Sequence, residues 1–283
     1  MIIFKKAIAL NQYITSLKQQ NKTIGFVPTM GALHPGHLSL IEASKEQCDI
    51  SVCSIFVNPT QFNDPKDFEK YPVTIDQDVL LLTQHYTDIL FLPSVYEIYP
   101  NGTNNLPYYD LGELENILEG KYRPSHFQGV CKVVHRLLKI VQPEKLFIGR
   151  KDYQQCMVIS KLIELKQLPV NIFIQPTMRE NSGLAMSSRN TRLSEEGSKK
   201  AVALYDTLVY IKEHFHSKGI SSLIEEANKR LLAANFEKVD YISIADAKTL
   251  QPLSNMNSST TAIVLAAAFI EGVRLIDNML ITT

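Results

Sequence analysis

Residues 23–37 read TIGFVPTMGALHPGH, and this stretch decides the fold class. Its first part, Thr23–Val27, is a short apolar run that predicts a buried strand. A turn with two glycines follows, and the pattern from His37 to Gln47 predicts a helix. A strand that passes through such a turn into a helix is typical of a parallel α/β sheet.

The same alternation continues through the first two thirds of the chain. Apolar residues at helical spacing between Phe127 and Val141 predict one amphipathic helix. Alternating strands and helices indicate a parallel sheet with helices on both faces. The further predicted strands are 50–57, 89–92, 145–148 and 171–174.

The pattern changes near Pro176, which indicates a second domain. Two predicted helices, 194–216 and 221–234, come before the predicted strands. Helices followed by strands predict a smaller α+β domain, so we expect a boundary between residues 176 and 190. The predicted strands of this part are 239–245, 262–270 and a shorter one at 272–275, with a polar loop at 255–261.

Composition excludes several classes of protein. The 283 residues suffice for one large domain or two ordinary ones. Lys and Arg together number 29, as do Asp and Glu, so the chain lacks the basic excess of a nucleic-acid binder. The N-terminus does not resemble a secretory signal, and the longest apolar run, 262–270, is too short to span a bilayer. We expect a cytoplasmic protein without nucleic-acid or membrane partners. The spacing of its four cysteines favours buried thiols over zinc ligands or disulfides.

The first motif with chemical potential is PTMGALHPGH, residues 28–37. It follows a predicted strand at the carboxyl edge of the sheet, where ligands bind. Backbone N–H groups at a helix start attract phosphate, and glycines such as Gly31 and Gly36 let backbone approach a ligand. His34 and His37 are three residues apart, so both imidazoles can donate hydrogen bonds to one phosphate as negative charge builds up.

The second motif, FVNPTQF at 56–62, follows the next predicted strand. Its amides Asn58 and Gln61 suit a carboxylate or hydroxyl ligand, because an amide donates without adding charge. A polar turn around Pro59 explains the same residues equally well.

The third motif, IGRKDYQQ at 148–155, again leads from a strand through a glycine into a helix. Gly149 lets the chain turn, and Lys151 can reach a phosphate as a point charge. Asp152 can hold a ribose or cap the helix, and Gln155 can point back toward the ligand.

The fourth motif comprises Met178-Arg179-Glu180 and MSSRN at 186–190. Two small hydroxyls before Arg189 suggest a mobile phosphate clamp, although a solvated linker has the same composition. The motifs together offer five side chains that could form a local cationic site for phosphate, namely His34, His37, Lys151, Arg179 and Arg189.

Together the four motifs resemble the pantoate–β-alanine ligases, and the resemblance covers essentially the whole chain. PTMGALHPGH is similar to the paired-histidine signature of adenylate-forming nucleotidyltransferases, and MSSRN to their mobile serine loop. The resemblance implies that ATP and (R)-pantoate form pantoyl adenylate and pyrophosphate. β-Alanine then attacks the adenylate, which releases pantothenate and AMP. It also implies Mg²⁺, a homodimer, a Rossmann-like domain over residues 1–180 that binds ATP and pantoate, and a smaller α+β lid domain over 181–283.

The resemblance also assigns roles to individual residues. The assigned catalytic residues are His37, the proton donor, His34 and Lys151. Pantoate is assigned to Gln61 and Gln155, and Gln61 is also expected to touch β-alanine. Weaker assignments are Asn58, Tyr71, Glu119 and His126. The implied ATP-binding residues are Met30, Gly31, Ala32, Leu33, His34, Pro35, Gly36, His37, Gly149, Arg150, Lys151, Asp152, Met178, Met186, Ser187, Ser188 and Arg189.

Some alternatives stay open at this level. Arg150 and Met178 depart from the residues commoner in the family. A nucleotidylyltransferase that leaves the nucleotide on its product shares the histidine pair, and a nucleotide-binding regulator without catalysis is a third possibility. The sequence assigns no protein ligand to a metal, because four aspartates, Asp64, Asp67, Asp76 and Asp78, are equally plausible for Mg²⁺.

Overall fold

The computed structural model describes residues 1–63, 65–255 and 261–281. Asp64 and residues 256–260 of the predicted polar loop therefore lie outside the described residues. The chain divides into two compact units. The first comprises Met1–Arg150 and Gln154–Pro176, and the second comprises Lys151–Tyr153 and Thr177–Thr283. The assignment of separate ligand-binding and lid functions to residues 1–180 and 181–283 stays a prediction.

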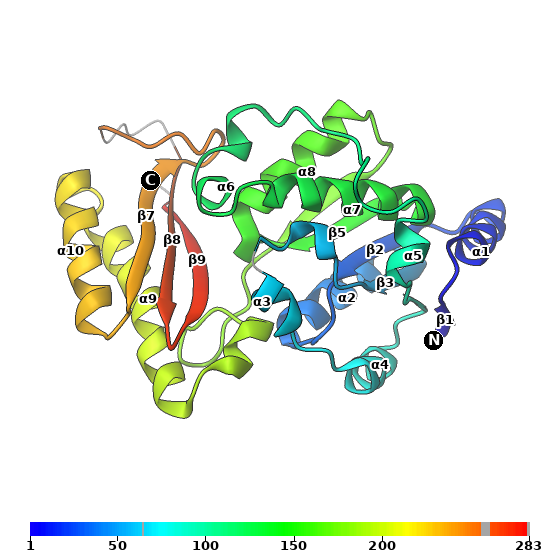
Figure 1. Ribbon diagram of the computed structural model, residues 1–283, viewed down its shortest axis with the longest axis horizontal. Coiled ribbons are helices and arrows are strands. Elements are labelled where there is room, and N and C mark those ends of the chain that lie inside the picture. The colour runs from blue at the N-terminus through cyan, green and yellow to red at the C-terminus, as the bar shows by residue number, and fades with distance from the viewer. Residues whose placement is uncertain (64, 256–260, 282–283) are drawn as a thin grey trace. The chain divides into compact units, whose positions relative to one another are not determined.

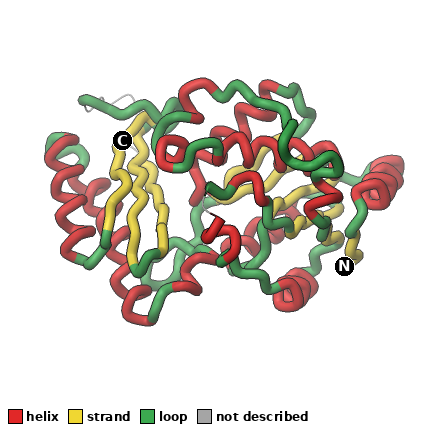
Figure 2. Tube along the Cα trace, in the orientation of Figure 1, coloured by secondary structure: helices red, strands yellow, loops and turns green. Residues whose placement is uncertain are grey.

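The first unit contains a six-stranded sheet in the order β1-β4-β3-β2-β5-β6, and every pairing is parallel (Figures 1 and 2). The chain runs from β2 to β3 on one side and later enters β5 on the other side of β2, so the strand order reverses at β2. The carboxyl ends of β3, β2 and β5 are therefore neighbours, and ligands bind at such reversals. The strands are β1 Ile2–Phe4, β2 Ile24–Thr29, β3 Ile50–Ile55, β4 Ile89–Phe91, β5 Lys145–Gly149 and β6 Asn171–Gln175.

Helices cover both faces of this sheet. Alternate residues of a strand point to opposite faces, and Phe26 and Val27 of β2 accordingly belong to different core clusters. The cluster around Phe26 includes α1 (Ala7–Gln19), α7 (His126–Val141) and α8 (Tyr153–Leu165). The cluster around Val27 includes α2 (Pro35–Gln47) and α4 (Ile75–Gln84). Shorter helical segments are η1 Pro59–Gln61, α3 Pro65–Glu69, α5 Val95–Ile98, η2 Gly112–Glu115, α6 Glu119–Tyr122 and η3 Arg150–Asp152.

The second unit contains a three-stranded antiparallel sheet in the order β7-β8-β9 (Figure 2). Its strands are β7 (Lys238–Asp246), β8 (Ala262–Ile270) and β9 (Val273–Ile281). Helices α9 (Glu195–His214) and α10 (Ile220–Ala233) pack on one face of this sheet. Ala262, Ala266 and Ala268 of β8 belong to that core, where small side chains let helices approach the central strand. A short segment, η4 (Ser188–Arg192), precedes α9.

The fold class expected from the sequence is confirmed: a parallel α/β sheet accompanied by a smaller antiparallel sheet with helices. Three of the elements differ from expectation. Strand β1 and helix α1 were not predicted, because β1 has only three residues and gains its partner from β4. Strand β9 extends to Ile281, beyond its predicted end at Leu275. The polar residues Asp277 and Asn278 interrupt the apolar pattern after Leu275, but in the structure both are buried within the strand. None of the helices in the described part of the chain combines the length and apolar character needed to cross a bilayer.

Candidate active site

The loop from β2 to α2 is held by a buried carboxylate. Gly31 has φ +83° and Ala32 φ +49°, so the chain turns through left-handed backbone immediately after β2. Asp78 of α4, fully buried, accepts the backbone N–H groups of Ala32 at 3.0 Å and Leu33 at 2.8 Å. Thr74 donates its hydroxyl to the same carboxylate at 3.1 Å. Helix α4 thus stabilises a turn in which Ala32, a residue with a Cβ, adopts the left-handed conformation that favours glycine.

The two histidines of this loop lie together. The ring centroids of His34 and His37 are 4.1 Å apart, because His34 caps α2 and His37 occupies its first turn. His34 Nδ1 accepts the backbone N–H of Gly36 at 3.2 Å. A neutral His34 ring therefore carries its proton on Nε2, which makes that atom a donor. The structure brings this predicted pair together, and both side chains are half-buried.

The loop after β3 places Gln61 beside Met30. Gln61 Nε2 lies 3.2 Å from Met30 Sδ, so the β2 and β3 loops meet at the same sheet edge. Asn58 Nδ2 donates to Gln61 Oε1 at 3.0 Å and to the Gly129 carbonyl at 3.1 Å. Asn58 is 1% exposed, so its amide positions Gln61 from within the protein.

Tyr99 completes the support of Asn58. Its hydroxyl donates to Asn58 Oδ1 at 2.8 Å. Burial raises the pKa of Tyr99 to about 12, so the phenol stays a neutral donor. The position of Gly129 in α7 requires glycine, because a Cβ there would lie 2.1 Å from the Thr60 carbonyl oxygen. Helix α7 can therefore pack directly against η1.

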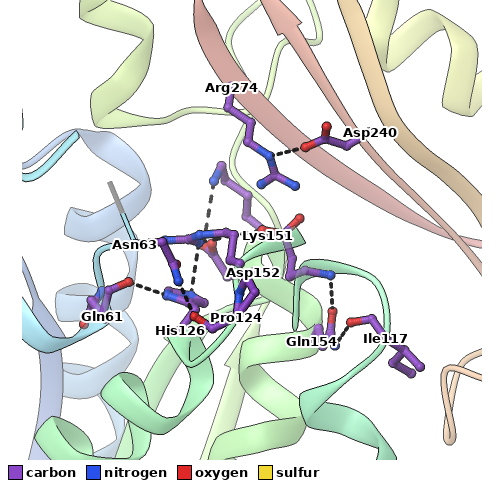
Figure 3. A network of polar contacts seen from close by, with 12 residues as sticks. Gln61, Asn63, Ile117, Pro124, His126, Lys151, Asp152, Gln154, Asp240 and Arg274 are labelled. Carbon is purple, nitrogen blue, oxygen red and sulfur yellow. Dashed lines mark hydrogen bonds and ion pairs between the residues drawn. The ribbon is translucent and has the colours of Figure 1, made fainter. Parts of the chain in front are cut away.

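His126, at the start of α7, also contacts this region (Figure 3). Its Nδ1 lies 2.8 Å from the Gln61 carbonyl oxygen, and its Nε2 lies 3.1 Å from Arg123 Nη1. Asn63 contacts the Pro124 carbonyl, which ties the same two segments together (Figure 3). Of the other weakly assigned residues, Tyr71 packs its ring against Phe62 at 5.8 Å, and both Tyr71 and Glu119 are buried. His126 thus contacts the backbone of Gln61, and its assignment to the site stays a prediction.

The loop after β5 departs from the expected role of its glycine. The φ of Gly149 is not positive, and a Cβ there would have no neighbour within 4 Å among the residues that the structure describes. The turn therefore does not need a glycine for its backbone conformation. Gln154 is committed to structure. Its Nε2 donates to the Leu114 carbonyl at 2.8 Å. It also donates to the Ile117 carbonyl at 2.9 Å (Figure 3). The following Gln155, the residue predicted to bind, is half-buried in the first turn of α8.

Lys151 and Asp152 belong to the second unit. The Lys151 ammonium lies 3.7 Å from Asp152 Oδ2, and the Lys151 carbonyl accepts Asn278 Nδ2 at 2.8 Å. The Tyr153 hydroxyl donates to the Ala247 carbonyl at 2.8 Å. The backbone of this segment is thus anchored while the Lys151 ammonium remains partly exposed.

The segment from Met178 to Met186 forms a tight hairpin. Met186 N–H donates to the Met178 carbonyl at 3.0 Å, and Arg179 pairs with Ala185 as an antiparallel bridge. Arg179 donates to both carboxylate oxygens of Asp277, at 2.6 and 3.0 Å. This ion pair neutralises Arg179, so the expectation that its guanidinium contributes to a cationic ligand site is not supported.

The predicted clamp residues follow that hairpin. Ser187 caps η4 by accepting the Arg189 N–H at 3.2 Å. Asn190 Nδ2 donates to the Ala185 carbonyl and to Glu180 Oε1, both at 3.1 Å, and so closes the segment back onto the hairpin. Met186, Ser187, Ser188 and Arg189 are all half-buried. The segment is a structured turn and not a solvated linker.

A family model described as pantoate-beta-alanine ligase matches residues 2–280. The chain belongs to the pantoate–β-alanine ligase family. Curated proteins named pantothenate synthetase are 43% identical in Cytophaga hutchinsonii (99% of each chain) and 42% in Leptospira biflexa (98% of each). A crystal structure of pantothenate synthetase from Thermus thermophilus matches with a TM-score of 0.92, 37% identity and full coverage of both chains. The Francisella tularensis ligase complexed with "Beta-gamma ATP" and β-alanine matches with a TM-score of 0.83, 39% identity and coverage of 99% of this chain and 97% of that one.

Sequence reasoning about this pantoate–β-alanine ligase missed the residues that hold its motifs. Asp78, Tyr99, Gly129, Asp277 and Asn278 all support a motif through a buried contact. One signal was available for Asp277 and Asn278: consecutive polar residues interrupt an otherwise apolar strand. The partners of all five lie far away along the chain, so no local pattern names them.

Proposed function

We infer that this chain is an ATP-dependent ligase that condenses pantoate with β-alanine. Membership of the family supports this reaction, and the arrangement that carries it is the meeting of the β2 and β3 loops, with the His34–His37 pair and Gln61, at one sheet edge. In the first step the pantoate carboxylate attacks the α-phosphorus of ATP and pyrophosphate leaves. In the second step the β-alanine amine attacks the acyl carbon of pantoyl adenylate, an amide bond forms and AMP leaves.

We propose that His34 and His37 act in the first step. Negative charge grows on the phosphate oxygens as the carboxylate adds, and fixed donors stabilise that charge. His34 offers Nε2–H because its Nδ1 is occupied by Gly36 N–H. His37 serves as the proton donor, and Lys151 adds a point charge. The remaining proposed ATP contacts are Met30–Pro35, Gly36, Gly149, Arg150, Asp152, Met178 and Met186–Arg189.

For pantoate we propose Gln61 and Gln155, with Gln61 also touching β-alanine. The amide of Gln61 keeps a fixed position because Asn58 holds its oxygen at 3.0 Å. A neutral amide suits this position, since it can orient an anionic carboxylate without neutralising the nucleophile. We further propose that residues 181–283 serve as a lid that keeps water from the adenylate.

Magnesium enters this proposal with ATP, as the MgATP substrate. Among the described residues no cluster of three or more His, Cys, Asp or Glu side chains is arranged to hold a metal. Mg²⁺ that is bound mainly by phosphates and water needs only one or two protein ligands, so the donor set is compatible with this role. Asp78 is a poor candidate, because its two oxygens already accept three hydrogen bonds. Homodimer assembly and a cytoplasmic location are further proposals that the family resemblance supports.

The test is AMP release from MgATP with pantoate and β-alanine added singly and together. The ligase forms AMP only when both are present, while pantoate alone supports exchange of pyrophosphate into ATP. Pyrophosphate release without AMP, with the nucleotide kept on an acceptor, would establish the nucleotidylyltransferase instead. ATP binding without turnover in any mixture would leave a nucleotide-binding protein.

A further inference from the structure

Two consecutive residues of β9 contact two different segments: Asp277 contacts the hairpin between Met178 and Met186, and Asn278 contacts the backbone of Lys151. Asp277 and Asn278 are 3% and 4% exposed. Consecutive side chains of a strand point to opposite faces of the sheet, so the two residues serve different neighbours. Asp277 shares its face with Leu275 and Met279, which pack in the core under α9 and α10.

On that face Asp277 anchors the hairpin that leads to Met186–Arg189. The Asp277 carboxylate accepts both terminal nitrogens of Arg179, at 2.6 and 3.0 Å. Arg179 also donates to the Gly183 carbonyl at 3.0 Å and lies 4.5 Å from the ring centroid of Tyr205 in α9. The guanidinium is therefore fixed by a carboxylate, a carbonyl and an aromatic face.

On the opposite face Asn278 anchors the segment that carries Lys151. Its Nδ2 donates to the Lys151 carbonyl at 2.8 Å. The main chain also links the two tethers: Asn278 N–H donates to Asp277 Oδ1 at 2.7 Å, and Arg179 Nη2 lies 3.4 Å from the Asn278 carbonyl oxygen. A shift of β9 at this point would therefore move both segments.

Stability alone does not account for polar residues at these positions. Burial raises the pKa of Asp277 against the opposing effect of Arg179, so the buried charge carries a desolvation cost. Replacing a buried ion pair with well-packed apolar residues is often neutral or stabilising. What the polar pair provides is directional contact, which fixes where each segment lies.

We propose that Asp277 and Asn278 are positioning residues that hold the Lys151–Asp152 and Met186–Arg189 segments in the arrangement that binds ATP, an inference that rests on the proposed function. Neither residue needs to touch a substrate, because each acts through the backbone of a segment. The proposal predicts a selective effect on ATP, since the predicted pantoate contacts Gln61 and Gln155 lie in the other unit.

The test compares Asn278→Ala and Asp277→Asn with wild type and with Leu231→Ala. Leu231 of α10 is fully buried and belongs to the same core, but it contacts neither segment in the described hydrogen-bond pattern. ATP affinity is measured by calorimetry, and the KM values for ATP and pantoate are measured by pyrophosphate exchange. We expect each tether variant to weaken ATP binding about ten-fold, as the loss of a hydrogen bond worth about 1.4 kcal/mol would do. The KM for pantoate should stay within about two-fold.

The control separates positioning from folding. Leu231→Ala should lower Tm and leave the KM for ATP unchanged. Equal rises in the KM for ATP and pantoate, or a lower Tm with unchanged ATP affinity, would overturn the proposal. If Asp277→Asn does not fold, Asn278→Ala keeps the ion pair and tests the second tether alone. Wild-type protein that binds ATP without exchange would contradict the proposed function, and the calorimetric comparison would still decide the positioning role.

Discussion

The carboxylate of Asp78 accepts the backbone N–H of Leu33 at 2.8 Å. The same carboxylate also accepts the amide of Ala32. His34 accepts the amide of Gly36 at its Nδ1 and the amide of His37 at its carbonyl oxygen. These amides of the β2–α2 loop are therefore already hydrogen-bonded within the protein. The sequence suggested that these amides attract phosphate. In the folded chain these four amides shape the loop, so the phosphate hydrogen bonds that we propose for this motif come chiefly from the imidazoles of His34 and His37.

Asp78→Asn should distort this loop. The amide NH₂ of asparagine cannot accept a hydrogen bond, so at least one N–H of Ala32 or Leu33 loses its acceptor, at a cost of about 1–3 kcal/mol. We expect a lower Tm together with a higher KM for ATP. Asp76→Asn is the matched control, because Asp76 is exposed in the same helix turn. Equal behaviour of the two variants would refute the supporting role of Asp78.

His37→Ala should slow adenylate formation far more than it weakens ATP binding. A donor that acts as charge develops contributes mainly to the transition state, and removing one commonly lowers kcat by about 10²–10³-fold. Rapid-quench measurement of pyrophosphate release gives the rate, and calorimetry gives the affinity. His85→Ala is a control, since His85 contacts Glu42 on the surface. Equal losses of rate and affinity would contradict the assigned role.

Gly149→Ala should leave stability nearly unchanged and weaken ATP binding. Its backbone does not require glycine, and within the described part of the chain the added Cβ would meet nothing within 4 Å. Any loss of ATP affinity would then come from the methyl group occupying space that the ligand uses. Gly219→Ala serves as the control, because its Cβ would also lie more than 4 Å from every neighbour that the structure describes. A variant with wild-type KM for ATP would remove Gly149 from the proposed site.

Gly183→Ala should disrupt the Arg179–Ala185 hairpin. The residue has φ +94°, and a Cβ would lie 2.3 Å from Cδ1 of Tyr205, so both backbone and packing resist the substitution. Gly272→Ala isolates the backbone contribution, since Gly272 has φ +67° and a Cβ there would meet no described residue within 4 Å. We expect Gly183→Ala to lower Tm more than Gly272→Ala and to raise the KM for ATP. Differential scanning calorimetry and exchange kinetics provide the comparison.

Asp49 should make stability depend on acidity below pH 4. Hydrogen bonds from the backbone N–H and hydroxyl of Thr23 lower its pKa to about 2. A carboxyl whose pKa is depressed by folding stabilises the protein above its unfolded pKa of about 3.9, and this contribution disappears as the pH falls through the folded value. Asp49→Asn should therefore lower Tm at pH 7, with a difference that shrinks as the pH approaches 2. A difference in Tm that is independent of pH would contradict this assignment.

The elements predicted correctly from the sequence are those that depend on residues close together in the chain, and those missed depend on contacts between distant residues. The strand at Ile24 and the helix ending at Gln47 depend on local periodicity, and they appear where the sequence indicates them. The three-residue strand β1 depends on pairing with β4, which lies more than 80 residues away, and no local signal announces it. Gln154 and Gln155 are chemically identical neighbours, and only hydrogen bonds to the carbonyls of Leu114 and Ile117 commit the first to structure.

By itself the sequence determined the order of strands and helices, the parallel class of the larger sheet and the motifs that identify the family, because these depend on side-chain period and residue type. Tertiary structure alone decided that Asp78 holds the β2–α2 loop, that Asp277 neutralises Arg179 and that Asn278 holds the Lys151 backbone. Each of these contacts joins residues that are far apart in sequence. Their hydrogen bonds exist only after the core has brought the strands and helices together, and burial then gives each bond its positional value.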